Sequence, residues 1–294
     1  RKNIQEKEKN DQDHTRQVHA ERRARYVKAV EQLADEKAPI RLGGVYTLIK
    51  LVDEWLADEK TLPNEEERRE EGQVIINSLC AYIRSTFDLT SKTEGLSQDE
   101  TPGNYEGGTQ RFTKDQARFR EEQEIRHIIL SEIKKRLNGD KVKNKEITPG
   151  TWSYFEYNFS DAHFFYAVNF NNSYFGASLN FLGATFTGYA NFFGATFTQD
   201  ANFIWATFTG YANFFGATFK YEPIFVYTLG NKTYKARFSC KADPEDYRFE
   251  VDPDSPCKIE TEEKEYNGVK FRIPKGAILF DPDGSSEQKD DNDS

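Results

Sequence analysis

The chain has 294 residues, of which 37% are hydrophobic and 30% are charged, and its formal net charge at pH 7 is −9. That length allows one large domain or two to three ordinary ones. The acidic balance argues against a dominant nucleic-acid-binding surface, which normally appears as a basic domain. No stretch approaches the roughly 20 consecutive apolar residues that a membrane-spanning helix needs.

Residues 14–138 are predicted to form a helical region. Apolar side chains recur there at the three- and four-residue spacing that places them on one face of a helix. The stripes are Tyr26, Ala29, Val30 and Leu33 in one segment, and Val45, Leu48, Ile49, Val52 and Leu56 in the next. Apolar helices in antiparallel succession suggest a small HEAT-like solenoid that binds protein. A helical cap that shields the following domain is the alternative.

Polar residues mark two expected helix starts in this region. Asn64 precedes three glutamates, which suits an N-cap followed by acidic residues at the positive end of the helix dipole. Thr113 and Gln116 have the spacing of a capping box and predict the start of the last helix, which ends at Asn138. The segment 86–112, rich in Gly, Ser and Thr, is predicted to be a flexible loop.

Residues 157–222 consist of six consecutive units of eleven residues. Asn occupies the second position of every unit, and Phe occupies the third and the eighth. The sixth position is Ala in five units and Ser173 in the other. The twelve phenylalanines are half of the 24 in the chain, so chance does not explain the pattern. Each unit holds two five-residue modules, A-N-F-x-x and A-T-F-x-x, and one inserted residue.

These modules resemble the pentapeptide-repeat family, in which a small residue stands two places before a central Leu or Phe. The resemblance implies a short right-handed quadrilateral β-helix within residues 150–222, with four modules per coil and the small and central side chains inside. The six units then make about three coils, and equivalent residues two units apart lie one above the other. Backbone groups of such a solenoid pair with the coils above and below. So short a stack needs covering at both ends, because open edges promote aggregation.

The helical sequences RYVKAVEQL, IRLGGVYTLIKL and VIINSLCAYIRS are similar to the region before the repeats in many actinobacterial and cyanobacterial members of that family. Such relatives often carry membrane helices upstream. The resemblance therefore implies the cytoplasmic part of a membrane-anchored protein, attached only through a segment before Arg1. Arg16, Arg22, Arg23 and Arg25 support this location, because positive charge near a membrane helix tends to remain inside. A soluble cytoplasmic protein, in which these arginines form a solvated helix face, is the alternative.

Six apolar residues of the repeat occupy the fourth or eleventh position of a unit, and these positions should face solvent. With two units per coil, they form three stacked pairs on the outside of the β-helix. Exposed apolar ladders usually mark a docking surface or a site covered by another part of the chain, and both interpretations stay open. The candidate partner-binding pairs are Leu182 with Ile204, Phe193 with Phe215, and Tyr189 with Tyr211.

Residues 223–284 are predicted to form a small antiparallel β-sheet that caps the last coil. Short alternating runs such as TYKARFS and VKFRI are separated there by Pro and Asn-Gly turns. The acidic segment 285–294 is predicted to be a disordered tail. Cys240 and Cys257 are expected to pair only in an oxidising compartment.

The sequence lacks the P-loop, the dinucleotide fingerprint, G-x-S-x-G and H-E-x-x-H. We therefore expect no catalytic activity, no cofactor and no metal. The predicted α+β chain indicates a non-enzymatic scaffold or interaction module that binds a protein and no nucleic acid. The alternative is a DNA-mimicking inhibitor of a type II topoisomerase, as some members of the family are. Such mimicry needs rows of carboxylates spaced like phosphates, whereas the repeat holds only Asp161, Asp200 and Glu222.

Overall fold

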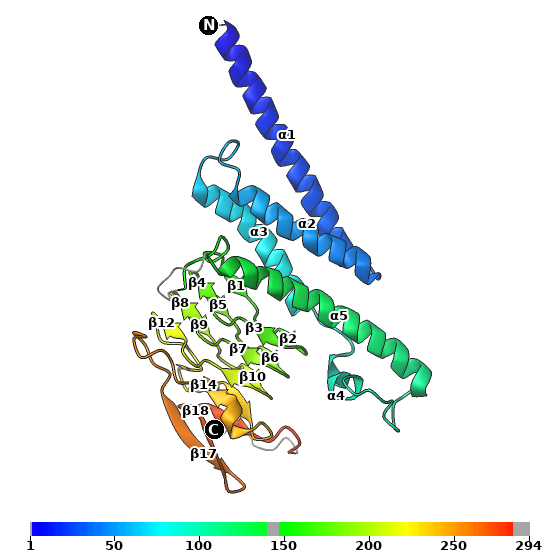
Figure 1. The fold of residues 1–294 in the computed structure, drawn as a ribbon, viewed down its shortest axis with the longest axis vertical. Helices are drawn as coiled ribbons and strands as arrows, with labels where there is room; N and C mark the ends of the chain where they lie inside the picture. The colour runs from blue at the N-terminus through cyan, green and yellow to red at the C-terminus, as the bar shows by residue number, and fades with distance from the viewer. Residues whose placement is uncertain (1, 140–146, 285–294) are drawn as a thin grey trace. The chain divides into compact units, whose positions relative to one another are not determined.

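The computed structural model describes residues 2–139 and 147–284. The chain divides into two compact units, Arg1–Tyr82 and Ile83–Ser294. The first unit is helical, and the second combines a long helix, a stack of short parallel strands and antiparallel strand pairs (Figure 1). The predicted α+β class, with helices before the strand stack and antiparallel pairs after it, is confirmed. The predicted tail, 285–294, lies outside the described residues.

The first unit is built from α1 (Lys2–Leu33), α2 (Ala38–Leu56) and most of α3 (Glu65–Arg84). The first helix begins earlier than the expected boundary at residue 14. Its opening turns are rich in Glu, Lys and Gln, which are strong helix formers, and they carry no apolar stripe that a periodicity search would detect. Asn64 caps α3 as predicted, since its side-chain oxygen accepts the N–H of Glu66 at 2.8 Å.

The helices α1 and α2 approach each other closely at Gly44. A Cβ atom at this position would lie 2.7 Å from the carbonyl oxygen of Ala29, closer than real Cβ atoms come to any atom. The adjacent Gly43 is exposed and has nothing within 4 Å of such an atom. Of the two adjacent glycines in α2, only Gly44 is therefore required by packing. Four residues of the predicted stripe are buried: Val45, Leu48, Ile49 and Val52.

The arginines of α1 form ion pairs within the first unit. Arg22 Nη1 lies 2.5 Å from Asp58 Oδ2, and Arg25 donates to both carboxylate oxygens of Glu54 at 2.7 and 3.1 Å. Burial alone would raise the pKa of Asp58, but hydrogen bonds from Thr61 and Arg22 outweigh it and lower the pKa to about 2. Arg22 and Arg25 therefore connect helices and are not a free cationic surface, whereas Arg16 and Arg23 stay largely exposed.

The second unit begins with η1 (Thr90–Lys92), α4 (Thr93–Leu96) and α5 (Gly108–Leu137). Part of the predicted loop 86–112 is thus helical, and α5 starts before Thr113. The Thr113 hydroxyl donates to the carbonyl of Thr109 inside the helix, so the expected capping box does not form. The Tyr105 hydroxyl donates to the buried carboxylate of Asp115 at 2.9 Å, which ties the remaining loop to α5.

Arg126 of α5 is buried and connects three parts of the second unit. Its Nε donates to Glu122 Oε1 at 2.7 Å. Its two terminal nitrogens donate to the carbonyl oxygens of Ile83 and Ser85 at 2.8 and 2.9 Å, where α3 ends and its last carbonyls lack helical partners. The guanidinium also lies 5.3 Å from the ring centroid of Phe165 in the first coil.

The helix α5 packs against the first coil of the strand stack. Gln123 Nε2 donates to the carbonyl of Phe165 at 2.7 Å, and the Lys134 ammonium donates to the side-chain oxygen of Asn171. Trp152, between α5 and the first strand, is fully buried. The alternative interpretation of the helical region, a cap on the first coil, therefore applies to α5.

Residues 157–219 form a quadrilateral β-helix with three regular coils. Each coil contributes one short parallel strand to each of four sheets, and equivalent residues of successive coils pair, as Asn158 does with Asn180. The predicted coil period of two repeat units is confirmed. The four sheets contain β1 (Tyr157–Asn158), β5 (Leu179–Asn180) and β9 (Ala201–Asn202); β2 (His163–Phe164), β6 (Thr185–Phe186) and β10 (Thr207–Phe208); β3 (Val168–Asn169), β7 (Ala190–Asn191) and β11 (Ala212–Asn213); and β4 (Tyr174–Phe175), β8 (Thr196–Phe197) and β12 (Thr218–Phe219).

The repeat phenylalanines fill the interior of these coils. Each of the twelve is at most 1% exposed, and rings one coil apart are stacked, as Phe186 and Phe208 are with centroids 4.8 Å apart. The predicted inward columns are confirmed. They consist of Phe159, Phe164, Phe170, Phe175, Phe181, Phe186, Phe192, Phe197, Phe203, Phe208, Phe214 and Phe219.

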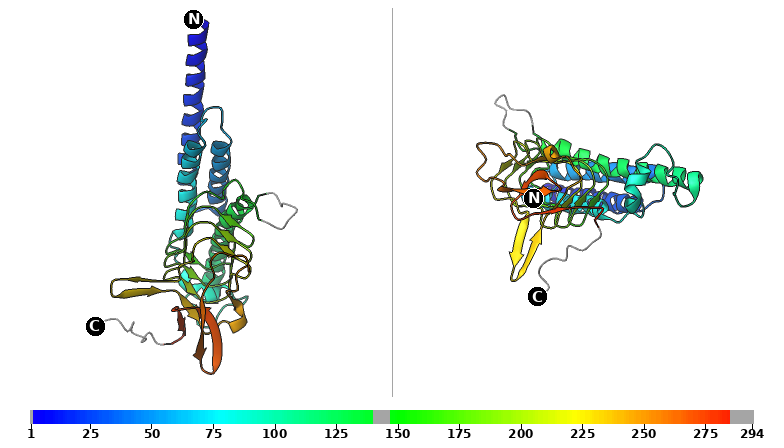
Figure 2. Two further views of the ribbon diagram at one scale, coloured as in Figure 1. Left: turned by 90° about the vertical axis from the view of Figure 1, so that its left-hand side faces the viewer. Right: turned by 90° about the horizontal axis from the view of Figure 1, so that it is seen from below.

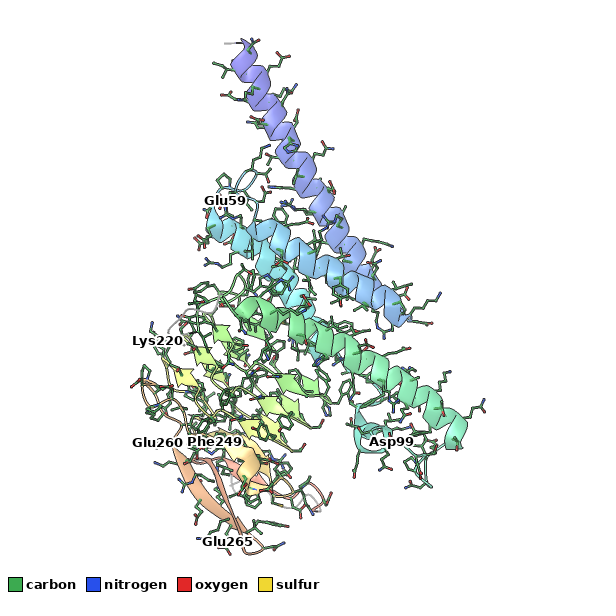
Figure 3. All side chains as sticks on the ribbon, in the orientation of Figure 1. Glu59, Asp99, Lys220, Phe249, Glu260 and Glu265 are labelled. Atoms are coloured by element: carbon green, nitrogen blue, oxygen red, sulfur yellow. The ribbon has the colours of Figure 1, made fainter. Side chains whose placement is uncertain are left out.

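The C-terminal residues add an irregular fourth coil, which differs from the separate covering sheet predicted. Phe225, Phe238 and Phe249 continue three of the four columns, 5.0, 4.9 and 5.8 Å from the rings beneath them. The predicted antiparallel pairing is present as two hairpins, one within this coil and one after it; Figure 3 labels Glu265 near the tip of the second. Cys240 and Cys257 are not joined. The elements are β13 (Val226–Leu229) with β14 (Lys232–Lys235), β15 (Arg237–Ser239), η2 (Pro244–Asp246), β16 (Tyr247–Arg248), β17 (Thr261–Tyr266) with β18 (Val269–Pro274), and β19 (Ile278–Phe280).

Candidate functional site: an aromatic face on the β-helix

One side of the β-helix carries two ladders of outward aromatic residues. The sheet β3–β7–β11–β16 forms this side. In the second and third coils, a Tyr stands just before the strand and a Phe stands two residues after it. The fourth coil adds an arginine. We define the aromatic face as Tyr189, Tyr211, Phe193, Phe215 and Arg248.

The tyrosine ladder is a tight stack along the axis of the β-helix. The ring centroids of Tyr189 and Tyr211 are 4.1 Å apart with an interplanar angle of 23°. Tyr189 is 54% exposed, whereas Tyr211 is half-buried. Asn213 Nδ2 donates to the Tyr211 hydroxyl oxygen at 2.7 Å, which fixes that ring. The predicted pairing of these two residues is confirmed, and Tyr189 presents the larger free surface.

The phenylalanine ladder lies at the other end of the same strands, two residues after each strand. Phe193 and Phe215 are both exposed, and their rings stack with centroids 6.0 Å apart. The Arg248 guanidinium lies 4.5 Å from the centroid of the Phe215 ring, within the range of a cation–π interaction. The phenylalanine ladder therefore ends at the fourth coil with the positive charge of Arg248 over the ring of Phe215.

An asparagine ladder lies between the tyrosine ladder and the phenylalanine ladder. Asn191 Nδ2 lies 3.5 Å from Asn169 Oδ1, and Asn213 Nδ2 donates to Asn191 Oδ1 at 3.3 Å. The Asn191 side-chain oxygen also accepts the N–H of Phe193 at 3.0 Å, the local pattern expected for this residue type at a corner. These hydrogen bonds fix the backbone next to each outward phenylalanine. The aromatic face therefore has a polar centre between the tyrosine ladder and the phenylalanine ladder.

The position of Arg248 depends on the strand that carries it. Tyr247 and Arg248 of β16 pair in parallel with Ala212 and Asn213 of β11. The Tyr247 hydroxyl donates to the carbonyl of Ser239 at 2.9 Å inside the fourth coil, and burial raises the pKa of Tyr247. Arg248 was not predicted. Its sequence signal is the run Y-R-F, a degenerate version of the A-N-F module.

The third predicted pair, Leu182 with Ile204, is not part of the aromatic face. Both residues lie at a different corner, after β5 and β9. Leu182 is half-buried and Ile204 is only 9% exposed, so the prediction that Ile204 faces solvent is wrong. The neighbouring Trp205 is exposed instead. The corresponding positions of three other units are Gly, and this departure from the repeat is the signal that was missed.

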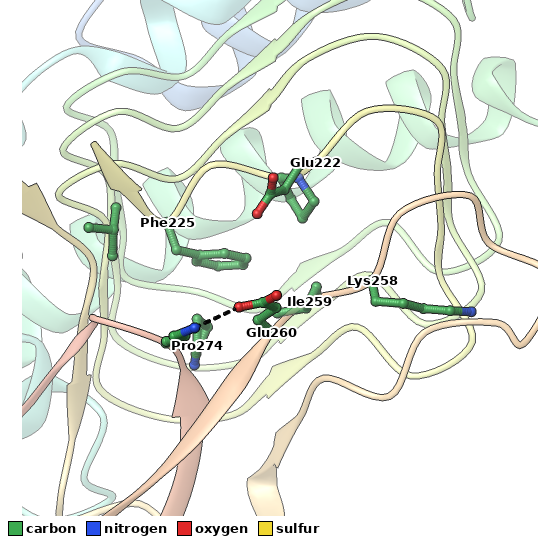
Figure 4. A pocket seen from close by; sticks show the side chains of 9 residues that line it. Glu222, Phe225, Lys258, Ile259, Glu260 and Pro274 are labelled. Atoms are coloured by element: carbon green, nitrogen blue, oxygen red, sulfur yellow. Dashed lines mark hydrogen bonds and ion pairs between the residues drawn. The ribbon is translucent and has the colours of Figure 1, made fainter. Parts of the chain in front are cut away.

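A shallow pocket of about 130 Å³ lies at the C-terminal end of the β-helix (Figure 4). Its two lysines bind a neighbouring carboxylate or the backbone. Lys275 Nζ donates to Glu260 at 3.0 Å, and Lys258 Nζ donates to two backbone carbonyls at 2.7 Å each. Phe225, which continues a buried column, also lines the pocket. These contacts hold together the residues that close the last coil of the β-helix. The aromatic face therefore remains the better candidate site.

Two kinds of feature are absent from the described residues. Residues 2–139 and 147–284 hold no group of three or more His, Cys, Asp or Glu side chains arranged to bind a metal ion. In the same ranges, no helix has both the length and the apolar character needed to cross a membrane.

No protein-family model matches the chain, and no curated protein or solved structure matches it.

Proposed function

We propose that the chain is a pentapeptide-repeat protein and that it acts as a non-enzymatic scaffold whose aromatic face binds a protein partner. Family membership is supported by the paired five-residue modules and by the four-sided stack of parallel strands. In this proposal the interior phenylalanines make the β-helix rigid, and the outward aromatic residues supply recognition.

The proposal is supported chiefly by aromatic rings that are exposed on one side of the β-helix. The strands on that side pair with the strands of the coils above and below. Tyr189, Phe193 and Phe215 are exposed, although the repeat would accept polar residues at these positions. Aromatic residues and arginine are enriched in protein interfaces, and binding hot spots favour Tyr, Trp and Arg. Arg248 above Phe215 adds a charged donor at the end of the face.

The size of the face limits the kind of contact it makes. Its two aromatic coils, about 4.8 Å apart, span only ~10 Å along the axis. Stable complexes bury about 800 Å² per partner. The aromatic face is smaller than that, so the partner either covers adjoining coils as well or binds transiently.

Membrane attachment through an upstream segment, and with it a cytoplasmic membrane location, stays a prediction. Arg22 and Arg25 pair with Asp58 and Glu54, so only Arg16 and Arg23 of the four arginines behind the prediction remain largely exposed. The DNA-mimicking alternative is not proposed, because three carboxylates over three coils supply too few charges to imitate a duplex.

Quantitative affinity capture tests the proposal. Tagged wild-type protein and the double variant Phe193→Ser/Phe215→Ser are compared in extract from the source cells. A protein enriched by the wild type and lost from the double variant supports the proposal. Gln199→Ser, an exposed polar change in the same repeat region, is the matched control and should retain that protein. Identical capture by all three proteins would exclude the aromatic face as the binding surface.

A further inference from the structure

The hairpin β13–β14 is a two-stranded arm, Val226–Lys235, inserted in the fourth coil. Figure 2 shows it projecting from the stacked coils in both views. Tyr227 pairs with Tyr234 and Leu229 pairs with Lys232 across the hairpin. Among the described strands, β13 and β14 pair only with each other. The arm therefore contributes little to the core, and its side chains are available for contact.

One face of the arm is apolar and aromatic. Opposed residues of an antiparallel pair share a face, so Tyr227, Leu229 and Tyr234 lie together. Lys232, opposite Leu229, is the charged residue of that face. Leu229, next to the tip, is 61% exposed. Trp205 of the third coil meets Tyr234 edge-on, with centroids 4.7 Å apart, and is itself 53% exposed. The apolar face of the arm is thus continuous with an exposed indole.

The backbone at Trp205 is in a conformation that is unfavourable for a tryptophan. Its φ is +60°, a left-handed conformation that costs a residue with a Cβ atom on the order of 1–3 kcal/mol. The corresponding residues of the other units are Gly183, Gly194 and Gly216, which avoid this cost, and Asp161 and Asn172, whose residue types tolerate the left-handed region. A tryptophan that is half-exposed at this corner is not explained by the packing of the β-helix.

The arm is basic although the protein is acidic. Its sequence, VYTLGNKTYK, has two lysines and no carboxylate, whereas the whole chain has a net charge of −9. Neither Lys232 nor Lys235 forms an ion pair with the described residues. Strands of four residues reach ~13 Å, which exceeds the Debye length of about 8 Å at physiological ionic strength. The tip and Lys232 beside it are therefore largely screened from the acidic body, whereas Lys235 lies at the base of the arm.

These features favour a lipid surface over an added β-strand. Lysines on a short edge strand are a common device that prevents pairing with another chain. Exposed Leu with Trp and Tyr beside Lys is the composition of segments that enter the interface of a bilayer, where aromatic rings have both an apolar and a polar environment. Basic residues add attraction to anionic headgroups.

We propose that the β13–β14 arm binds the surface of an anionic membrane, with Leu229 and Tyr227 entering the interface and Lys232 and Lys235 contacting the headgroups. This contact is peripheral and differs from the upstream anchor expected from the sequence. It is also independent of the protein contact proposed for the aromatic face, since neither surface includes residues of the other.

Vesicle binding tests this proposal. The chain is mixed with phosphatidylcholine vesicles that either lack phosphatidylglycerol or contain it as about a quarter of the lipid. Sedimentation measures binding, and tryptophan emission reports on the arm, because Trp55 and Trp152 are buried and Trp205 is exposed. We expect binding to the anionic vesicles, a blue shift of the emission, and weaker binding as salt increases.

Variants locate the contact. Leu229→Ser should weaken partitioning about tenfold, and each of Lys232→Gln and Lys235→Gln should weaken it about fivefold. Val269→Ser, at an exposed apolar position beside the tip of the other hairpin, is the matched control and should leave binding unchanged. The proposal is overturned by an absence of binding to the anionic vesicles, by equal binding to both vesicle types, or by binding that the arm variants leave intact.

Discussion

The guanidinium of Arg248 lies over the ring of Phe215, although more than one regular coil of chain separates the two residues. Residues inserted in the fourth coil lengthen the chain between Phe215 and Arg248. After these insertions, β16 pairs in parallel with β11 again. The end of the aromatic face is therefore built by the irregular part of the β-helix. A repeat of identical units would have placed no cation there.

Removing a ring from the interior should destabilise the second unit strongly. Phe203 is fully buried and stacks between Phe181 and Phe225 at 5.5 and 5.0 Å. Phe203→Ala is expected to cost about 3–5 kcal/mol and to lower the melting temperature by roughly 10 °C. Phe193→Ala, on the exposed ladder, is the control and should change stability by less than about 1 kcal/mol. Equal melting temperatures for the two variants would show that the inward assignment is wrong.

The two adjacent glycines of α2 should respond in opposite directions. At Gly44 a methyl group would meet the carbonyl of Ala29, so Gly44→Ala is expected to destabilise the first unit by about 1–3 kcal/mol. At Gly43 the space is open, and Gly43→Ala should stabilise the helix by up to about 1 kcal/mol. Urea denaturation followed by circular dichroism measures both. Stabilisation by Gly44→Ala would contradict the close helix contact.

Truncating the buried arginine of α5 should be far more damaging than truncating an exposed one. Arg126→Met removes the cation that pairs with the nearly buried carboxylate of Glu122, and it is expected to cost about 3–5 kcal/mol. Arg118 forms an exposed pair with Asp88, so Arg118→Met should cost no more than about 1 kcal/mol. Chemical denaturation compares them. Similar losses would mean that Arg126 does not connect α5 to the end of α3.

The stability of the second unit should decrease in mild acid because of His163. Burial and the nearby charge of Arg126 lower the pKa of this imidazole. The folded-state pKa thus lies below the unfolded value of about 6.5, so the unfolded chain takes up the proton first. Stability that is present above about pH 6.5 is lost as the pH falls toward the folded-state pKa.

Thermal denaturation between about pH 7.5 and pH 5 measures this effect. The melting temperature of the wild type should fall across that interval, and His163→Gln should remove part of the fall. Carboxylates such as Asp58, whose pKa is lowered to about 2, lose their contribution only at lower pH. An identical pH profile for the two proteins would exclude His163 as the source.

The interior of the β-helix could be predicted because its period is regular. One small and one large residue per module leave a single inward arrangement, and twelve phenylalanines follow it. The fourth coil was hidden by insertions. Ala236 and Phe238 keep the spacing of a module, but the β13–β14 arm separates them from the preceding Phe225 and breaks the two-unit register.

Other features depend on partners that sequence patterns do not identify. Arg22 and Arg25 have the composition of a basic cluster, but acidic residues distant in sequence pair with them. Ile204 occupies a position that faces solvent in a regular coil, yet it is buried in the fold. The tyrosine and phenylalanine ladders were predicted correctly because only the coil period determines them.

Site-specific photo-crosslinking tests whether the aromatic face binds a protein. A photoreactive phenylalanine derivative is placed at Phe193 in one protein and at Gln199, an exposed position outside the aromatic face, in another. Both proteins are produced in the source cells and irradiated there. We expect a discrete adduct of one partner from position 193 and none from position 199. Adducts of the same kind from both positions, or from position 199 alone, would contradict this expectation.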